Sequence, residues 1–159
     1  MRRSWSRIGE RAVLPQKQGF QNSYLFTALE PLTGESFHLI GFSDMDTDTE
    51  LAFLNELKKQ YPNEHVIEVI DNAPCHKPKV LHAIPGLTII YLPSYSPELN
   101  PVERFFEEIR RATACEIFST LALVEERISK AVNEWSDDLP KMKNLICYDW
   151  IKEQIGGVS

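Results

Sequence analysis

The order of apolar and polar positions divides the chain into strand-like segments followed by helix-like segments. Segments 24–29 and 36–42 are rich in strand-forming residues and are separated by a turn signal, so they predict a β-hairpin. Apolar runs at 65–70 and 87–92 predict two further strands, and a short strand is expected near 12–14. Strands that are joined through helical segments are expected to be parallel.

A helix is predicted over residues 47–60, where leucines recur at helical spacing. Thr47 is the expected N-cap of this helix, and Glu50, three positions later, completes a capping-box pattern. Another short helix is expected between residues 76 and 83, after the first of the two apolar runs. The first half of the chain therefore alternates strands and helices.

From Asn100 onward the pattern is helical. Asn100 is a favourable N-cap, and Pro101 suits the first position of a helix. Apolar residues then recur at the spacing of one buried helix face, namely Val102, Phe105, Phe106 and Ile109. Further helices are expected over residues 119–135, from near residue 137, and after Tyr148.

This order of elements predicts one α/β domain over residues 1–159, with a mixed sheet flanked by helices and a helical tail that starts near residue 100. The hairpin is the antiparallel part of the sheet, and the helix-linked strands are its parallel part. A length of 159 residues with 43% hydrophobic residues suits a single domain with its own core. No apolar stretch approaches the roughly 20 residues that span a bilayer, so we expect no membrane partner.

The net charge of the chain and the distribution of its charged residues give opposite indications about binding to nucleic acid. A net charge of −6 counts against DNA binding, because neutralising phosphates requires lysine and arginine. The charge is uneven, however, because residues 1–20 carry five basic residues against one acid, whereas residues 44–50 carry four acids and no base. A basic arm could contact phosphate while bound metal offsets the acids. Ordinary solvated surface charge is the alternative.

The cysteines indicate a reducing compartment. Cys75, Cys115 and Cys147 are widely spaced and form no Cys-x-x-Cys pair. Such a sparse, odd set is typical of reduced thiols rather than of a disulfide framework or a zinc site. We therefore expect a cytoplasmic protein, associated with the nucleoid if it acts on DNA.

Two acids stand where phosphoryl-transfer chemistry would need them. Asp71 directly follows the strand at 65–70, and Glu103 lies on the first turn of the helix that starts after Asn100. Carboxylates placed at strand ends can hold divalent metal and act on nucleic acid. The alternatives are that Asp71 stabilises a local turn and that Glu103 caps its own helix, and Glu107, one turn further along, competes for the same role.

Other polar residues are weaker candidates. His76 could donate to phosphate or orient water, but it could equally cap a loop. Cys75 beside His76 allows an unrelated α/β hydrolase, although no oxyanion-hole pattern accompanies the pair. Asp44, Asp46 and Asp48 resemble a metal loop, but they lack the glycine and the final glutamate of an EF-hand, so a solvated turn before a helix is favoured.

Two motifs resemble a known family. Residues 71–76 read D-N-A-P-C-H, and residues 92–103 read L-P-S-Y-S-P-E-L-N-P-V-E. Together they resemble the catalytic core of insertion-sequence transposases of the mariner-like superfamily, with Ser94 where a second proline is common. The resemblance implies an RNase H-like fold in which three acids bind two Mg²⁺ or Mn²⁺ ions, cleave DNA at transposon ends and join it to target DNA. It makes Asp71 the second acid and Glu103 the third. His76 stays a candidate catalytic residue through the chemistry of its side chain, apart from the resemblance.

The resemblance departs from the family pattern at its start. The first acid of the family lies on a strand upstream of an Arg-Arg-x-Trp segment, which here is residues 2–5, directly after Met1. By this comparison the first strand and its Asp are missing here, so we expect the C-terminal portion of a transposase core that is weak or inactive alone. Its open sheet edge would favour homo-oligomers or a strand supplied by an upstream transposase fragment. The alternative function is a non-enzymatic remnant that acts by association with a full-length or split partner.

Overall fold

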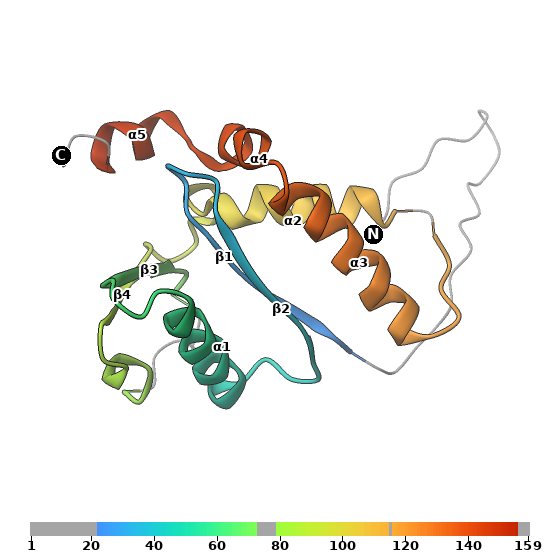
Figure 1. The fold of residues 1–159 in the computed structure, drawn as a ribbon, viewed down its shortest axis with the longest axis horizontal. Coiled ribbons are helices and arrows are strands. Elements are labelled where there is room, and N and C mark those ends of the chain that lie inside the picture. The colour runs from blue at the N-terminus through green and yellow to red at the C-terminus, as the bar shows by residue number, and fades with distance from the viewer. Residues whose placement is uncertain (1–21, 73–78, 115, 156–159) are drawn as a thin grey trace.

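The computed structural model describes residues 22–72, 79–114 and 116–155, which form a mixed α/β fold (Figure 1). Its elements are β1 (Tyr24–Leu29), β2 (Ser36–Phe42), α1 (Thr47–Gln60), β3 (Val66–Ile70), the 3-10 turn η2 (Leu81–Ala83), β4 (Leu87–Tyr91), the 3-10 turn η3 (Pro97–Leu99), α2 (Pro101–Ala112), α3 (Leu121–Ser136), α4 (Leu139–Ile146) and α5 (Asp149–Ile155). The predicted fold class, the hairpin and the helical second half are confirmed. No described helix has the length and apolar character that a membrane crossing requires.

The described strands form two separate sheets of two strands each, not the one mixed sheet that was predicted, because no backbone ladder joins the hairpin to the parallel pair within the described residues. Strands β1 and β2 pair antiparallel, with Leu29 opposite Ser36 beside the turn. Strands β3 and β4 pair parallel, with Val66 opposite Leu87, as predicted for strands joined by a crossover. The carboxyl ends of β3 and β4 therefore lie at the same edge of their sheet, and Asp71 follows at that edge.

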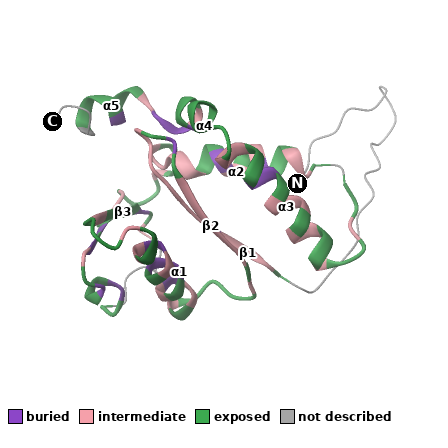
Figure 2. Ribbon diagram, in the orientation of Figure 1, coloured by how far each residue is buried: buried purple, intermediate pink, exposed green. Residues whose placement is uncertain are grey.

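The hairpin carries a hydrophobic core on each of its two faces, because successive side chains of a strand point to opposite sides (Figure 2). Phe26 faces the first core, which we call the α1 core. The buried members of the α1 core are Phe26, Phe53, Leu54, Leu57, Ile70, Leu81, Ile84, Leu87 and Ile89. Leu25 and Leu29 face the second, which we call the α2 core. The buried members of the α2 core are Phe105, Ile109, Ala131, Val132, Met142 and Ile146.

The start of α1 differs by one residue from the sequence prediction. The N-cap is Asp46, not Thr47, and the capping partner at the third helical position is Thr49, not Glu50. The Asp46 carboxylate accepts from the backbone N–H of Thr49 at 2.9 Å, while the Asp46 N–H donates to Thr49 Oγ1 at 3.0 Å. The bond from Thr49 N–H, and a second one from Thr49 Oγ1 to the same carboxylate, lower the pKa of Asp46. Aspartate is at least as good an N-cap as threonine, so the box forms one position earlier.

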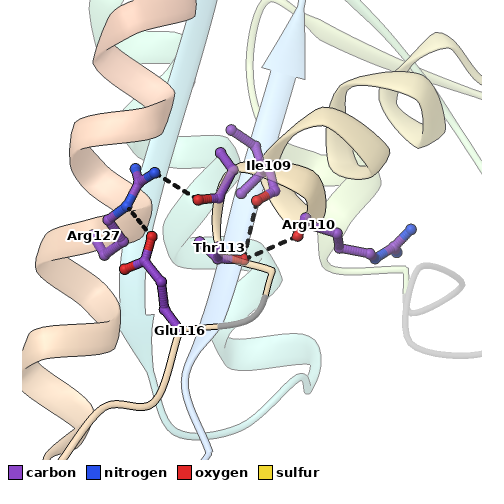
Figure 3. Close-up of polar contacts among 6 residues, drawn as sticks. Ile109, Arg110, Thr113, Glu116 and Arg127 are labelled. Carbon is purple, nitrogen blue, oxygen red and sulfur yellow. Dashed lines mark hydrogen bonds and ion pairs between the residues drawn. The ribbon is translucent and has the colours of Figure 1, made fainter. Parts of the chain in front are cut away.

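The carboxyl end of α2 is held by an arginine from α3 (Figure 3). Arg127 Nη2 donates to the backbone oxygen of Ala112 at 2.5 Å, and its Nε donates to Glu116 Oε1 at 3.1 Å. Thr113 Oγ1 donates to the carbonyl oxygen of Ile109 at 3.1 Å. Helix ends leave backbone carbonyls without intrahelical partners, so these contacts stabilise the terminus and fix α2 against α3.

A chain of polar groups joins the hairpin to α3 and α2. His38 Nδ1 lies 3.0 Å from Thr27 Oγ1, and its Nε2 lies 3.2 Å from Ser136 Oγ. Ser36 Oγ donates to the same Ser136 Oγ at 3.0 Å, and the imidazole stacks on Phe105 with ring centroids 5.2 Å apart. Burial in this position lowers the pKa of His38 to about 4, so the ring is neutral at pH 7.

Two predicted elements fall partly or wholly outside the described residues. The strand expected near residues 12–14 lies there entirely. Of the helix expected at 76–83, the described part is the η2 turn, Leu81–Ala83, and residues 73–78 lie outside the description. Pro85 and Gly86 follow one residue after the end of η2, which limits the extension of this turn.

The buried imidazole predicts acid sensitivity of folding. Between pH 6.5 and about 4 the unfolded chain binds a proton at His38 that the folded chain does not, so stability falls as the pH falls through this window. The loss reaches at most about 3 kcal/mol. Urea unfolding at pH 7 and pH 4.5 measures it. His38→Gln keeps hydrogen-bonding groups but does not titrate, so its unfolding free energy should depend less on pH, and equal slopes in the two proteins would contradict the assignment.

Two glycines with positive φ offer a matched test of how the hairpin turn docks. Gly34 has φ +87°, and a Cβ there would overlap the backbone oxygen of Leu139 at the start of α4. Gly41 has φ +104°, but a Cβ added there would have Glu125 Oε1 as its nearest neighbour, at 4.0 Å. We expect Gly41→Ala to cost about 1–2 kcal/mol of stability from backbone strain alone. Gly34→Ala should cost roughly 3 kcal/mol or more, as measured by chemical denaturation. Equal losses would mean that the turn does not press against α4.

Candidate active site

A pocket of about 460 Å³ lies where the carboxyl ends of β3 and β4 meet the start of α2. The loop after β3, the loop after β4 and the first turn of α2 all contribute to it. Its lining residues are Asp71, Asn72, Leu92, Pro93, Ser94, Tyr95, Ser96, Pro97, Asn100 and Glu103. Asp71 and Glu103, the acids singled out in the sequence, therefore face one cavity although 32 residues separate them in the chain (103 − 71).

Strand pairing sets the position of Asp71. Ile70, the last residue of β3, is buried in the α1 core, and its carbonyl oxygen accepts from Leu92 N–H at 2.8 Å. This bond extends the parallel ladder by one step beyond Tyr91, so the chain cannot fray before Asp71. Next along the chain, Asn72 Nδ2 donates to Ser94 Oγ at 3.1 Å and ties the two strand ends together. The Asp71 side chain is exposed at the mouth of this edge.

Helix capping sets the position of Glu103. The side chain of Asn100 accepts from Val102 N–H at 3.1 Å, and Pro101 occupies the first helical position, as predicted. The Asn100 N–H, which a capping box would offer to Glu103, already donates to the carbonyl oxygen of Pro97 at 3.0 Å. The exposed Glu103 carboxylate therefore has no need to turn back on its own helix, and it faces the pocket.

The loop after β4 holds a strained residue at the rim. Tyr95 has φ 61°, and it is the one non-glycine residue with positive φ in the part of the chain that the structure describes. For a bulky side chain this conformation costs about 1–2 kcal/mol. Pro93 and Pro97 restrict the loop on either side. The Tyr95 side chain is 101% exposed, so its ring packs against nothing.

The donor atoms around the cavity suit a hard divalent cation. The pocket offers carboxylate, amide and hydroxyl oxygens from Asp71, Glu103, Asn72, Asn100 and Ser94. Mg²⁺ prefers oxygen ligands and usually keeps several waters, so it needs only one or two protein carboxylates. Within residues 22–72, 79–114 and 116–155, no group of three or more His, Cys, Asp or Glu side chains is placed to share an ion. The described site thus presents two carboxylates.

The other acidic residues that the sequence offered as metal ligands do not line the pocket in the structure. Glu107 lies on the exposed surface of α2 and does not line the pocket, so Glu103 is the acid of α2 that shares the pocket with Asp71. Asp46 caps α1, and Asp44 accepts from Ser43 Oγ at 2.7 Å, which agrees with the expected solvated turn. His76, like Cys75, lies outside the described residues.

Sequence reasoning did not single out Tyr95, and it treated Asn72 and Asn100 only as turn or cap residues. The sequence signal that could have found Tyr95 is its position between Pro93 and Pro97. Two prolines this close restrict the loop, which favours an aromatic side chain that points to solvent. The pairing of Asn72 with Ser94 had no sequence signal, because it depends on the register of two strands.

Comparison with known proteins agrees with this architecture. The profile of the DDE superfamily endonuclease family matches residues 1–135. An uncharacterized protein, y4pE/y4sA of Sinorhizobium fredii (strain NBRC 101917 / NGR234), is 30% identical over 89 residues, which is 55% of this chain and 65% of that protein. The chain thus spans less than two thirds of the length of this curated relative.

A solved structure has the same fold. The Mos1 transposase, in a paired-end complex with the left transposon end, superposes with a TM-score of 0.67 at 18% identity, over 96% of this chain and 48% of the transposase chain. The sequence resemblance to transposases with an RNase H-like core is therefore confirmed at the level of the fold. Because the family profile covers most of the sequence, the chain belongs to the DDE superfamily of endonucleases.

Proposed function

We propose that this chain is a catalytic portion of a transposase whose pocket holds a divalent metal for cleavage and transfer of DNA strands. The single observation that carries the proposal is the presence of Asp71 and Glu103 in the lining of one cavity at the carboxyl edge of a parallel strand pair. Ligand sites of α/β folds gather at this edge. Transposon ends and target DNA are the proposed substrates, and Mg²⁺ or Mn²⁺ is the proposed cofactor.

The residues of the pocket have distinct tasks in this proposal. Asp71 and Glu103 hold the ion, Asn72 and Ser94 keep the two strand ends in register, and Asn100 fixes the first turn of α2 that carries Glu103. When bound, a divalent ion stabilises charge on the phosphoryl oxygens and lowers the barrier to attack. His76 remains a proposed participant through its neighbouring position in the sequence.

Electrostatics supports a requirement for the cation. Both carboxylates are exposed, and the whole chain carries a net charge of −6. A DNA phosphate approaching two carboxylates is repelled unless positive charge lies between them. The cation therefore serves binding as well as chemistry, and substrate affinity should depend on it.

Metal binding gives the direct test. Asp71→Asn and Glu103→Gln should each weaken Mn²⁺ binding at least tenfold, because each removes one of two anionic ligands. Titration of free Mn²⁺ by electron paramagnetic resonance measures the affinity, and nicking of a supercoiled plasmid in Mn²⁺ reports activity. Glu107→Gln is the matched control, since it removes the same charge from α2 outside the pocket. Wild-type affinity in both pocket variants would refute the proposed site.

A specific surface supports a second function by association. The face of the parallel pair opposite the α1 core exposes Ile67, Val69 and Ile90 by 60%, 47% and 48%. Parallel sheets are normally covered on both faces. We therefore propose, as the alternative, that the chain binds a transposase partner or an upstream transposase fragment that adds a strand beside β3 and covers this face.

Association is tested by size measurement. Mixing the chain with a full-length transposase of the family should give a co-eluting complex in light-scattering chromatography. The double variant Ile67→Asp with Ile90→Asp should abolish that complex, because it places charge on the apolar face. Ile117→Asp, at a side chain that is 57% exposed elsewhere, is the control and should leave the complex intact. Separate elution of the two wild-type proteins would rule out this alternative.

A further inference from the structure

The loop after β4 presents an aromatic ring that the proposed metal chemistry does not use. Tyr95 lines the same pocket as Asp71 and Glu103, yet its side chain is fully exposed, with a relative accessibility of 101%. Both faces of the ring are therefore open. The ring therefore adds no packing to the fold and is available to contact a ligand in the pocket.

The backbone around the ring is rigid rather than loose. Leu92 N–H donates to the carbonyl oxygen of Ile70 on the amino side of the loop, and Ser94 Oγ accepts from Asn72. On the carboxyl side, Leu99 N–H donates to the carbonyl oxygen of Ser96 at 3.1 Å within η3. The positive φ of Tyr95 is thus imposed from both sides. Strain of this kind persists where surrounding structure fixes it, and it is enriched at ligand sites.

We propose that Tyr95 stacks on an unpaired nucleobase next to the phosphate that the pocket binds. The inference rests on the proposed function for the substrate class, namely DNA, and adds the contact that positions it. The phosphate and the base of one nucleotide are close neighbours, so a pocket lined by two acids that would hold the cation and by one open ring fits both. Every base has a π-face, so stacking of this kind positions a strand without reading its sequence.

The chemistry of the loop favours a base over a protein surface as the occupant. Tyr95 is flanked by Ser94 and Ser96, which are polar, and the nearby carboxylates are exposed. An apolar protein patch would leave these polar groups desolvated without partners. A base offers a flat apolar face to the ring and leaves its polar edges and its phosphate to the hydroxyls and to the cation.

The test uses a DNA single strand of 12 nucleotides with 2-aminopurine at its centre, titrated with the whole chain in Mg²⁺ at low ionic strength. Stacking on an aromatic ring quenches 2-aminopurine fluorescence. Tyr95→Asn removes the ring while keeping a residue that tolerates positive φ, so the loop should keep its shape. We expect quenching to disappear and affinity to fall about 5- to 100-fold, whereas Tyr95→Phe should stay within about twofold of wild type.

Met45→Asn is the matched control, because it truncates a side chain that is 54% exposed outside the pocket. It should bind and quench like wild type. Wild-type quenching in Tyr95→Asn, or no quenching by the wild-type chain, would overturn the inference.

Mn²⁺ titration of the same proteins separates this inference from the metal site. Tyr95→Asn should bind Mn²⁺ as wild type does. If Mn²⁺ binds through Asp71 and Glu103 while Tyr95→Asn still quenches, the stacking role fails and the metal site stands. If the wild-type chain quenches through Tyr95 but binds no Mn²⁺, the metal site fails and the stacking role stands.

Discussion

The hairpin of β1 and β2 is the constraint on which the site depends, because it carries a core on each face. The α1 core fixes β3, and with it the strand end that bears Asp71. The α2 core fixes α2, and with it the helix start that bears Glu103. The two acids are therefore positioned by two different cores, which lie on opposite faces of the hairpin. Any shift of one core relative to the other changes the separation of the carboxylates.

Several contacts reinforce this shared element. His38 bonds within the hairpin to Thr27, reaches α3 through Ser136 and stacks on Phe105 of α2. Arg127 locks the far end of α2 to α3. Polar groups in a half-buried position stabilise only if their partners are present, so this network fixes one arrangement of helices on the hairpin rather than many. A metal site needs such precision, because small displacements of ligands weaken coordination strongly.

The pocket combines unfavourable features that a ligand would relieve. Two carboxylates line one cavity in a chain of net negative charge, and Tyr95 keeps a strained backbone and an unpacked ring. Neither feature stabilises the folded chain by itself. The proposed cation would offset the first feature, and the proposed stacked base would offset the second. Membership of the DDE superfamily is consistent with this, and it comes from the sequence profile rather than from the pocket.

The sequence by itself determined the elements, and it placed Asp71 after a strand and Glu103 in the first turn of a helix, because these follow from local rules. Periodicity placed the hairpin, the parallel strands and the helices, and the Asn100-Pro101 start fixed the phase of α2. It missed the α1 cap by one position, because Asp46 and Thr47 are both good caps and only the hydrogen bonds decide between them. The tertiary structure decided that Glu103 rather than Glu107 joins Asp71, and that Tyr95 stands open at the rim. These outcomes depend on how the α1 core and the α2 core pack their helices and strands against one hairpin. Contacts between residues far apart in the chain leave no periodic signal in the sequence.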